Sequence, residues 1–179
     1  MILRFDSVSG NTDFTLLYEK IDFLRSKINC GVYLSYSPLF HSAAESGRTY
    51  RQILDDLSDY KNFFNVNTCK LHRAKREGIE IVSHGLIYID HRLLTYAQQE
   101  LSILTARYLV NSKKFVPPFN KYNEDTEKIC NKYLISLIKT EDLWSNFDRE
   151  KFTSQKLQWF TQSYKHNLDQ FKEIINNGL

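Results

Sequence analysis

Apolar side chains recur at helical spacing through most of this 179-residue chain, and this pattern restricts the fold more than any other feature of the sequence. Chain-breaking residues are scarce, because the whole sequence holds 6 glycines and 3 prolines. Sandwiches and barrels need a turn residue every few positions, so this composition argues against them. The spacing predicts helices over about residues 13–29, 48–64, 90–110, 123–138 and 148–176.

Strand character is confined to short segments. Residues 2–5 fit a short strand or an N-terminal arm, and residues 32–36 fit a strand or a buried connector. Residues 79–89 alternate apolar and polar side chains around a break at Ser83–Gly85, which predicts a β-hairpin or a small wing. The predicted fold class is therefore mostly α, with about five amphipathic helices around one core and a hairpin or wing near 79–89.

The consecutive prolines Pro117 and Pro118 mark the clearest boundary, because they deny the chain a helix. We expect a main helical domain over residues 1–116 and a C-terminal helical pair over 119–179, packed on the same core as a single domain overall. Phe115 and Phe119, on either side of the boundary, are expected to anchor the loop onto that core. Helical spacing predicts these core residues: Leu57, Leu101, Leu104, Phe160, Tyr164 and Leu168.

The net charge of +3 is concentrated in the middle of the chain. Residues 65–116 carry 8 basic and 4 acidic side chains, whereas the flanking segments are close to balanced. A local cationic surface attracts anionic partners, although short basic clusters are also common on solvated surfaces. The candidate phosphate-contacting residues for DNA or RNA are Lys70, Arg73, Lys75, Arg76 and Arg92.

Three of the five histidines lie in the same block, together with one cysteine. Thiolate and imidazole are ligands that zinc prefers, so Cys69, His72, His84 and His91 are the candidate ligands of a zinc site. Their spacing matches no standard zinc finger, and we predict neither a metal nor another cofactor. The same histidines near Arg73, Arg76 and Arg92 supply the residue types of a His-dependent nuclease, which stays an alternative.

No nucleotide-binding, dinucleotide-binding or hydrolase motif is present in the sequence. The function predicted is a non-enzymatic accessory or regulatory domain, acting through protein contacts and through nucleic-acid phosphate contacts from residues 70–92. The alternative in another class is a purely protein-binding subunit or oligomer of a larger assembly. The partner expected first is another protein or a second copy of the chain. DNA or RNA is the next candidate, and no membrane partner is expected.

The three cysteines form no even set and no Cys-x-x-Cys pair, which is typical of reduced thiols. No apolar run approaches the ~18 residues that span a bilayer, and the first residues lack the pattern of a signal peptide. These features predict a cytoplasmic protein. The Lys/Asn/Ile/Tyr-rich composition is compatible with an AT-rich bacterial or phage source.

Overall fold

A parallel β-sheet lies at the centre of the computed structural model, which describes residues 2–10, 12–38, 52, 71–139 and 168–178. The described strands follow each other across the sheet in chain order, and every neighbouring pair is parallel. The strands are β1 (Ile2–Val8), β2 (Gly31–Tyr36), β3 (Glu80–Ser83), β4 (Lys114–Phe115) and β5 (Ser136–Leu137).

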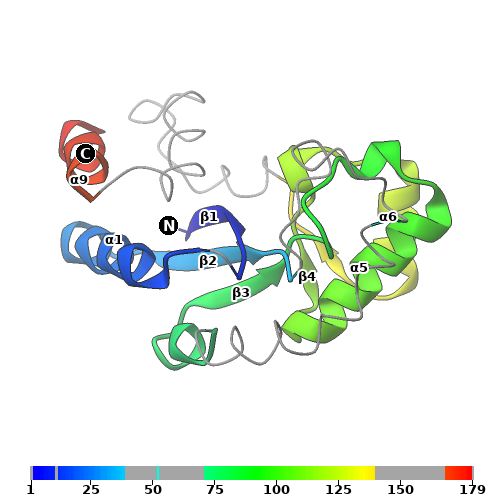
Figure 1. Cartoon of the computed structure of the whole chain (residues 1–179), viewed down its shortest axis with the longest axis horizontal. Helices are drawn as coiled ribbons and strands as arrows, with labels where there is room; N and C mark the ends of the chain where they lie inside the picture. The colour runs from blue at the N-terminus through cyan, green and yellow to red at the C-terminus, as the bar shows by residue number, and fades with distance from the viewer. Residues whose placement is uncertain (1, 11, 39–51, 53–70, 140–167, 179) are drawn as a thin grey trace.

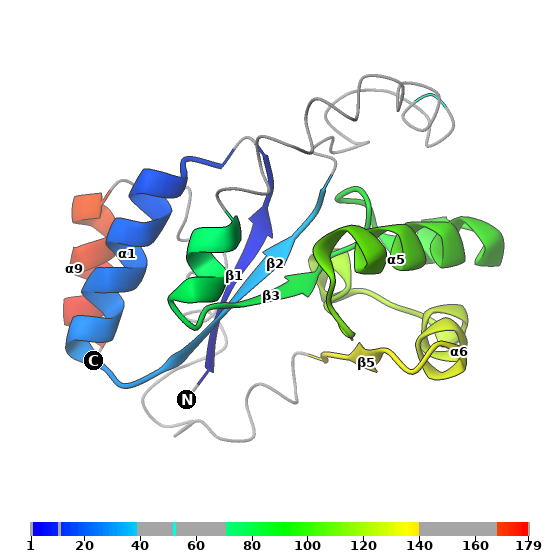
Figure 2. The same cartoon turned by 90° about the horizontal axis from the view of Figure 1, so that it is seen from below.

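Helices connect or flank these strands, and their starts have clear sequence causes (Figure 1). α1 (Phe14–Lys27) begins where the side chain of Asp13 accepts a hydrogen bond from the backbone N–H of Leu16. α5 (Tyr96–Val110) and α6 (Glu124–Lys132) each begin with a reciprocal capping box, formed by Thr95 with Gln98 and by Asn123 with Thr126. α9 (Leu168–Gly178) lies beside α1 in both views (Figures 1 and 2).

Two apolar clusters hold these elements together. The larger cluster joins β1, β2 and β3 to α1 and α9, with Phe5, Leu34 and Phe171 among its fully buried members. The smaller cluster joins β4 and β5 to α5 and α6 around Ile103, Phe115 and Ile129. None of the described helices has the length and apolar character needed to cross a bilayer.

The prediction of a mostly α fold is wrong, because the described chain forms an α/β fold around a five-stranded parallel sheet. Residues 79–89 are not a hairpin or wing. Glu80–Ser83 instead pairs in parallel with β2 on one side and with β4 on the other, so β3 lies inside the sheet. Hairpin reasoning considers only neighbours in sequence, whereas parallel pairing joins strands that are far apart along the chain.

Several predicted elements are confirmed. The helix expected over 13–29 is α1, and residues 2–5 and 32–36 are strands. The helix expected over 90–110 begins later, because α5 starts at Tyr96. The helix expected over 123–138 is correct only for its first part, because α6 ends at Lys132 and Ser136–Leu137 forms β5. The helix expected over 48–64 and most of that expected over 148–176 lie outside the described residues. The predicted division of the chain at residues 116–119 is not tested and stays a prediction.

The face of α5 that packs inward differs from the predicted face. Leu101 is 47% exposed and Tyr108 is 83% exposed, whereas Gln99 and Ser102 are completely buried. Leu104 packs partly buried against the smaller cluster, and Leu168 is half-buried. The apolar stripe predicted the wrong buried face because Gln99 and Ser102 can be buried when hydrogen bonds satisfy their polar groups. The predicted core residues Leu57, Phe160 and Tyr164 lie outside the described residues.

Candidate functional site

The carboxyl ends of β1, β2, β3 and β4 meet at one edge of the sheet. The backbone N–H of Ser37 donates to the carbonyl of Val8, and the N–H of His84 donates to the carbonyl of Tyr36. In open parallel sheets, ligands bind outside the carboxyl ends of the strands. This edge is therefore where a functional site is expected.

Alternate residues of the strands point to opposite faces of the sheet. The register pairs Phe5 with Leu34 and Leu34 with Ile81, and all three belong to the apolar cluster under α1. The other face carries Arg4, Asp6 and Ser35, which are 4%, 8% and 0% exposed. Polar side chains this deeply buried need partners, so this face is not ordinary core.

Arg4 and Asp6 form an ion pair on that polar face. Arg4 Nη2 donates to Asp6 Oδ2 at 2.7 Å and also to the side-chain oxygen of Asn120 at 2.5 Å. Arg4 Nε lies 2.7 Å from Asp6 Oδ1, although their alignment does not make a hydrogen bond. The side chain of Arg4 therefore ties β1 to the loop that follows β4.

His84 follows β3 directly and is 1% exposed. Its Nδ1 lies 2.8 Å from the carbonyl oxygen of Val116, and because a carbonyl only accepts, Nδ1 carries the proton. The pKa of His84 is lowered to about 4, mainly by burial and to a smaller extent by the charge of Arg4, while Asp6 and the bond to Val116 oppose the shift. The ring is neutral at pH 7, with the lone pair on Nε2.

Several buried polar atoms of this cluster have no hydrogen-bond partner in the described part of the structure. They include His84 Nε2, Arg4 Nη1 and Ser35 Oγ, whereas Asp6 Oδ1 is held by its ion pair with Arg4 Nε. An unsatisfied buried polar group costs about 1–3 kcal/mol, so native proteins rarely hold several together without a reason. A ligand that supplies both donors and acceptors would satisfy this cluster. We refer to Arg4, Asp6, Ser35 and His84 as the edge cluster.

His91 supports the loop that carries His84. Its Nδ1 donates to the carbonyl of Ile89 at 3.1 Å, and its Nε2 accepts from Ser102 Oγ at 3.2 Å. Ser102 Oγ in turn accepts from the backbone N–H of Leu86 at 3.0 Å. Gly85 has φ +81°, and a Cβ there would lie 2.7 Å from the His91 ring. The imidazole of His91 thus packs where only glycine leaves room.

The four residues weighed for zinc do not converge on a metal site. His72 is exposed on the helical residues 71–76, His91 uses both ring nitrogens in hydrogen bonds, and Cys69 lies outside the described residues. Among the residues that the structure describes, no three or more His, Cys, Asp or Glu side chains are placed to hold a metal. Asp6 and His84 would supply two ligands, fewer than the three protein ligands usual in catalytic zinc sites. We derive no step through a metal.

The candidate phosphate-contacting residues lie apart from the edge cluster. Arg73 donates to Glu77 at 2.7 Å and stacks 4.0 Å from the centroid of the Tyr18 ring, and Arg92 is paired with Asp90 at 2.7 Å. Lys75 and Arg76 are exposed on the helical residues 71–76, and Lys70 lies outside the described residues. Contact between these side chains and phosphate stays a prediction.

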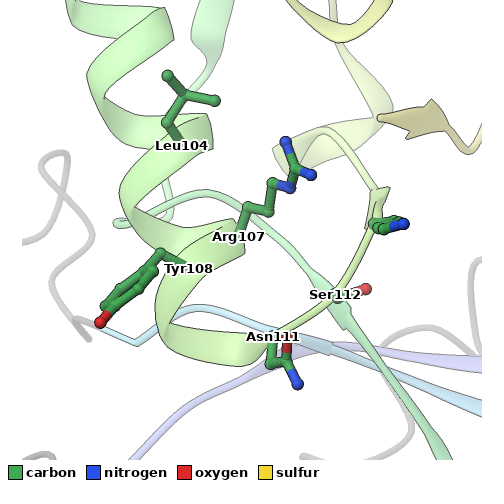
Figure 3. A pocket seen from close by; sticks show the side chains of 6 residues that line it. Leu104, Arg107, Tyr108, Asn111 and Ser112 are labelled. Atoms are coloured by element: carbon green, nitrogen blue, oxygen red, sulfur yellow. The ribbon is translucent and has the colours of Figure 1, made fainter. Parts of the chain in front are cut away.

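A separate open pocket of about 590 Å³ lies at the C-terminal end of α5 (Figure 3). Leu104, Arg107 and Tyr108 project from the helix, and Asn111 and Ser112 lie in the following turn. The guanidinium of Arg107 already donates to the carbonyl of Tyr133 at 3.0 Å. This turn leads into the start of β4, so the pocket lies at the edge of the sheet opposite to the edge cluster.

Sequence reasoning missed Asp6, Arg4 and Ser35, and it placed His84 at the tip of a hairpin. A signal was present: Ser37 and His84 each come directly after a short strand, and Asp6 lies two residues before the end of β1. That pattern becomes informative only once the strands are known to be parallel, because parallel strands bring their carboxyl ends to the same edge.

The fold is similar to that of family 4 carbohydrate esterases. The Streptomyces lividans enzyme, solved in complex with acetate, aligns with a TM-score of 0.54 and 13% identity, over 98% of this chain and 86% of that one. A mutant CE4 family pseudoenzyme aligns with a TM-score of 0.49 and 13% identity, over 99% of this chain and 60% of that one. The CE4 domain of a multidomain xylanase from the hindgut metagenome of Trinervitermes trinervoides aligns with a TM-score of 0.43 and 16% identity. This alignment covers 71% of this chain and 52% of that one. No protein-family model matches the sequence, and no curated protein matches it either.

This likeness corrects the predicted function. A helical, non-enzymatic regulatory domain was expected, whereas the chain has the α/β fold of carbohydrate esterases. The regulatory and nucleic-acid-binding function is therefore unsupported. The His-dependent nuclease is unsupported as well, because His72 lies on an exposed helix while His84 and His91 are buried.

Proposed function

We propose that this chain is a carbohydrate esterase-like hydrolase that removes an acyl group, with acetyl as the first candidate, from a carbohydrate at the edge cluster. The observation that carries the proposal is the set of buried, unpartnered polar atoms at the carboxyl edge of the sheet. The likeness to an esterase solved with acetate supports the choice of substrate class.

The edge cluster contains the groups that acyl hydrolysis needs. His84 Nε2 carries a lone pair, so it can take a proton from a water molecule as the water oxygen bonds to the acyl carbon. Asp6, whose charge raises the pKa of His84, stabilises the imidazolium formed in this step. Arg4 Nη1 lacks a partner and can donate to the acyl oxygen as negative charge develops on it. The bond to the sugar oxygen then breaks, and that oxygen leaves with the proton.

The protonation of His84 sets the pH range of this reaction. Because burial lowers the pKa of His84 to about 4, the base form is fully populated at pH 6 and above. The same low pKa makes His84 a weak base, so the proposed reaction depends on Asp6 to stabilise the transferred proton. We expect activity to persist to about pH 5, below the range of a histidine with an ordinary pKa.

One observation favours a second candidate, which is carbohydrate binding without hydrolysis. Arg4 holds Asp6 in an ion pair that is almost completely buried, with side chains 3% and 12% exposed. A carboxylate held in this way is less available to stabilise a transferred proton. The site would then recognise an acylated sugar through its unpartnered atoms and leave it unchanged.

The compartment and the partners stay proposals. We propose a reducing, cytoplasmic location, which is supported by the free thiols of Cys30 and Cys130. Burial raises the pKa of Cys130 to about 12, which keeps that thiol protonated and unreactive. We also propose a protein partner or self-association of the chain.

Acetate release tests the proposed hydrolysis. The purified full chain is incubated with O-acetylated xylo-oligosaccharides and with the hexamer of N-acetylglucosamine, and free acetate is measured over time. We expect acetate from at least one of these substrates, in proportion to protein concentration. Binding of a substrate with no acetate released favours the second candidate, and neither binding nor release contradicts both.

A further inference from the structure

An exposed aromatic side chain lies next to the edge cluster. Phe119 follows the two prolines after β4 and is 45% exposed, whereas Phe115, Val116, Pro117 and Pro118 are all buried. The sequence predicts that Phe115 and Phe119 both anchor the loop onto the core. Phe115 does so, and Phe119 does not. Burial of the core therefore does not explain why a large aromatic residue occupies this position.

The backbone holds Phe119 in a conformation that bulky residues avoid. Phe119 and Asn120 have φ values of +58° and +57°, in the left-handed region that favours glycine. Two backbone hydrogen bonds close this turn, from Asn120 to Pro117 at 3.0 Å and from Lys121 to Pro118 at 3.1 Å. The side chain of Asn120 also accepts from Arg4. Strained residues held by their surroundings concentrate at ligand-binding sites, and this turn is tied directly to the edge cluster.

Three rings form a continuous row from the buried histidine to the surface. The ring centroids of His84 and Tyr88 lie 5.3 Å apart, and those of Tyr88 and Phe119 lie 4.4 Å apart. His84 is buried, Tyr88 is half-buried and Phe119 is exposed. A ligand that reaches the unpartnered Nε2 of His84 therefore has an aromatic surface beside it.

We propose that Tyr88 and Phe119 form a platform on which a sugar ring of the substrate stacks, next to the edge cluster. The face of an aromatic ring is electronegative, and the axial C–H groups of a pyranose present weakly positive hydrogens to it. Stacking of this kind recognises a sugar ring without a charge on either partner. This inference rests on the proposed function and adds to it the part of the substrate that the chain recognises.

Binding of oligosaccharides without acyl groups tests the platform separately from hydrolysis. Xylohexaose and cellohexaose are each titrated into the full chain by calorimetry, so no turnover contributes to the signal. We expect at least one to bind to the wild type, and Phe119→Ala to weaken that binding at least tenfold. Tyr108→Ala is the matched control, because Tyr108 is an exposed aromatic on α5 at the opposite edge of the sheet, and it should bind like the wild type.

Phe119→Gly separates the role in binding from any role in folding. Glycine adopts φ +58° without strain, so this variant should unfold at the same temperature as the wild type or higher, and still bind at least tenfold more weakly. Wild-type affinity in both Phe119 variants would overturn the platform. A wild type that binds neither oligosaccharide would overturn it too, whether or not acetate is released. Binding that depends on Phe119 without acetate release would leave the platform standing and remove the hydrolase.

Discussion

The two faces of the same strands differ in kind. Phe5, Leu34 and Ile81 face α1 in a closed apolar cluster, whereas Arg4, Asp6 and Ser35 face the other way with several polar atoms unpartnered. Both sets of side chains are buried, so the faces differ in whether the buried atoms have suitable partners: apolar contacts on one face, and incomplete hydrogen bonding on the other. The apolar face is built for stability, and the polar face retains unsatisfied groups that a ligand can use.

Neighbouring residues on β2 give the sharpest test of this contrast. Leu34 and Ser35 are both 0% exposed, but they point to opposite faces of the sheet. Leu34→Ala should lower the free energy of unfolding by roughly 2–5 kcal/mol, because it leaves a cavity in a packed cluster. Ser35→Ala should change it by less than about 1 kcal/mol or raise it, because its hydroxyl has no partner among the described residues.

Urea unfolding of the two variants measures both values. Equal losses of unfolding free energy in the two variants would contradict the comparison, because the polar face would then be packed as tightly as the apolar face. A large loss from Ser35→Ala alone would mean that its hydroxyl has a partner.

Acid should destabilise the protein through its two buried histidines. Burial lowers the pKa of His84 and of His91 to about 4, whereas an unfolded histidine titrates near pH 6.5. Between these values the unfolded chain binds more protons, so stability is complete above about pH 6.5 and is lost as the pH falls toward 4. The expected loss at pH 5 is roughly 2 kcal/mol for each histidine.

Unfolding free energies at pH 7 and pH 5 measure this loss, with His84→Asn as the comparison. Asparagine removes the titrating group and can still donate to the carbonyl of Val116, so the pH dependence should fall by about half. An unchanged dependence would show that other groups cause the acid sensitivity.

Strained turns extend the comparison beyond the sheet. Leu134 and Phe119 both have positive φ values, +52° and +58°, but Leu134 lies at the end of α6, where the N–H of Ile135 donates to the carbonyl of Cys130 at 2.8 Å. Leu134→Gly should raise the free energy of unfolding by up to about 1 kcal/mol by removing left-handed strain. Substrate affinity should not change, because Leu134 lies away from the edge cluster. A Leu134→Gly variant that binds substrate more weakly would show that strain relief by itself disturbs the site.

The sequence predicts local structure better than it predicts the site. Asn123 caps α6 through interactions within one turn, and such a signal is readable from neighbouring residues. The cap expected for the first helix was Asn11 or Thr12, whereas Asp13 caps α1, so the local signal was correct to within two residues. Strand character near Ile2 and Val32 was also readable, because it depends on local side chains. The parallel order of the strands was not, because β2 and β3 pair across more than 40 residues of intervening sequence.

α5 shows why helical spacing alone can choose the wrong face. Gln99 accepts from Thr126 Oγ1 at 2.6 Å and donates to the carbonyl of Leu94 at 3.1 Å, so it can be buried without penalty. Ser102 is buried in the network of His91 and Leu86. A stripe of Leu101 and Tyr108 looks like a core face only if buried polar partners are unknown. The site was missed for the same reason, since its residues are defined by long-range contacts.

The central claim is that His84 acts at the carboxyl edge of the sheet, and a pair of histidine variants tests it most directly. His84→Asn removes the lone pair at Nε2, whereas His72→Asn changes an exposed histidine on the helical residues 71–76, which precede β3. With the acetylated oligosaccharide that the wild type hydrolyses, kcat/KM should fall at least about 100-fold in His84→Asn and stay unchanged in His72→Asn. A folded His84→Asn protein that releases acetate within threefold of the wild-type rate would contradict the account.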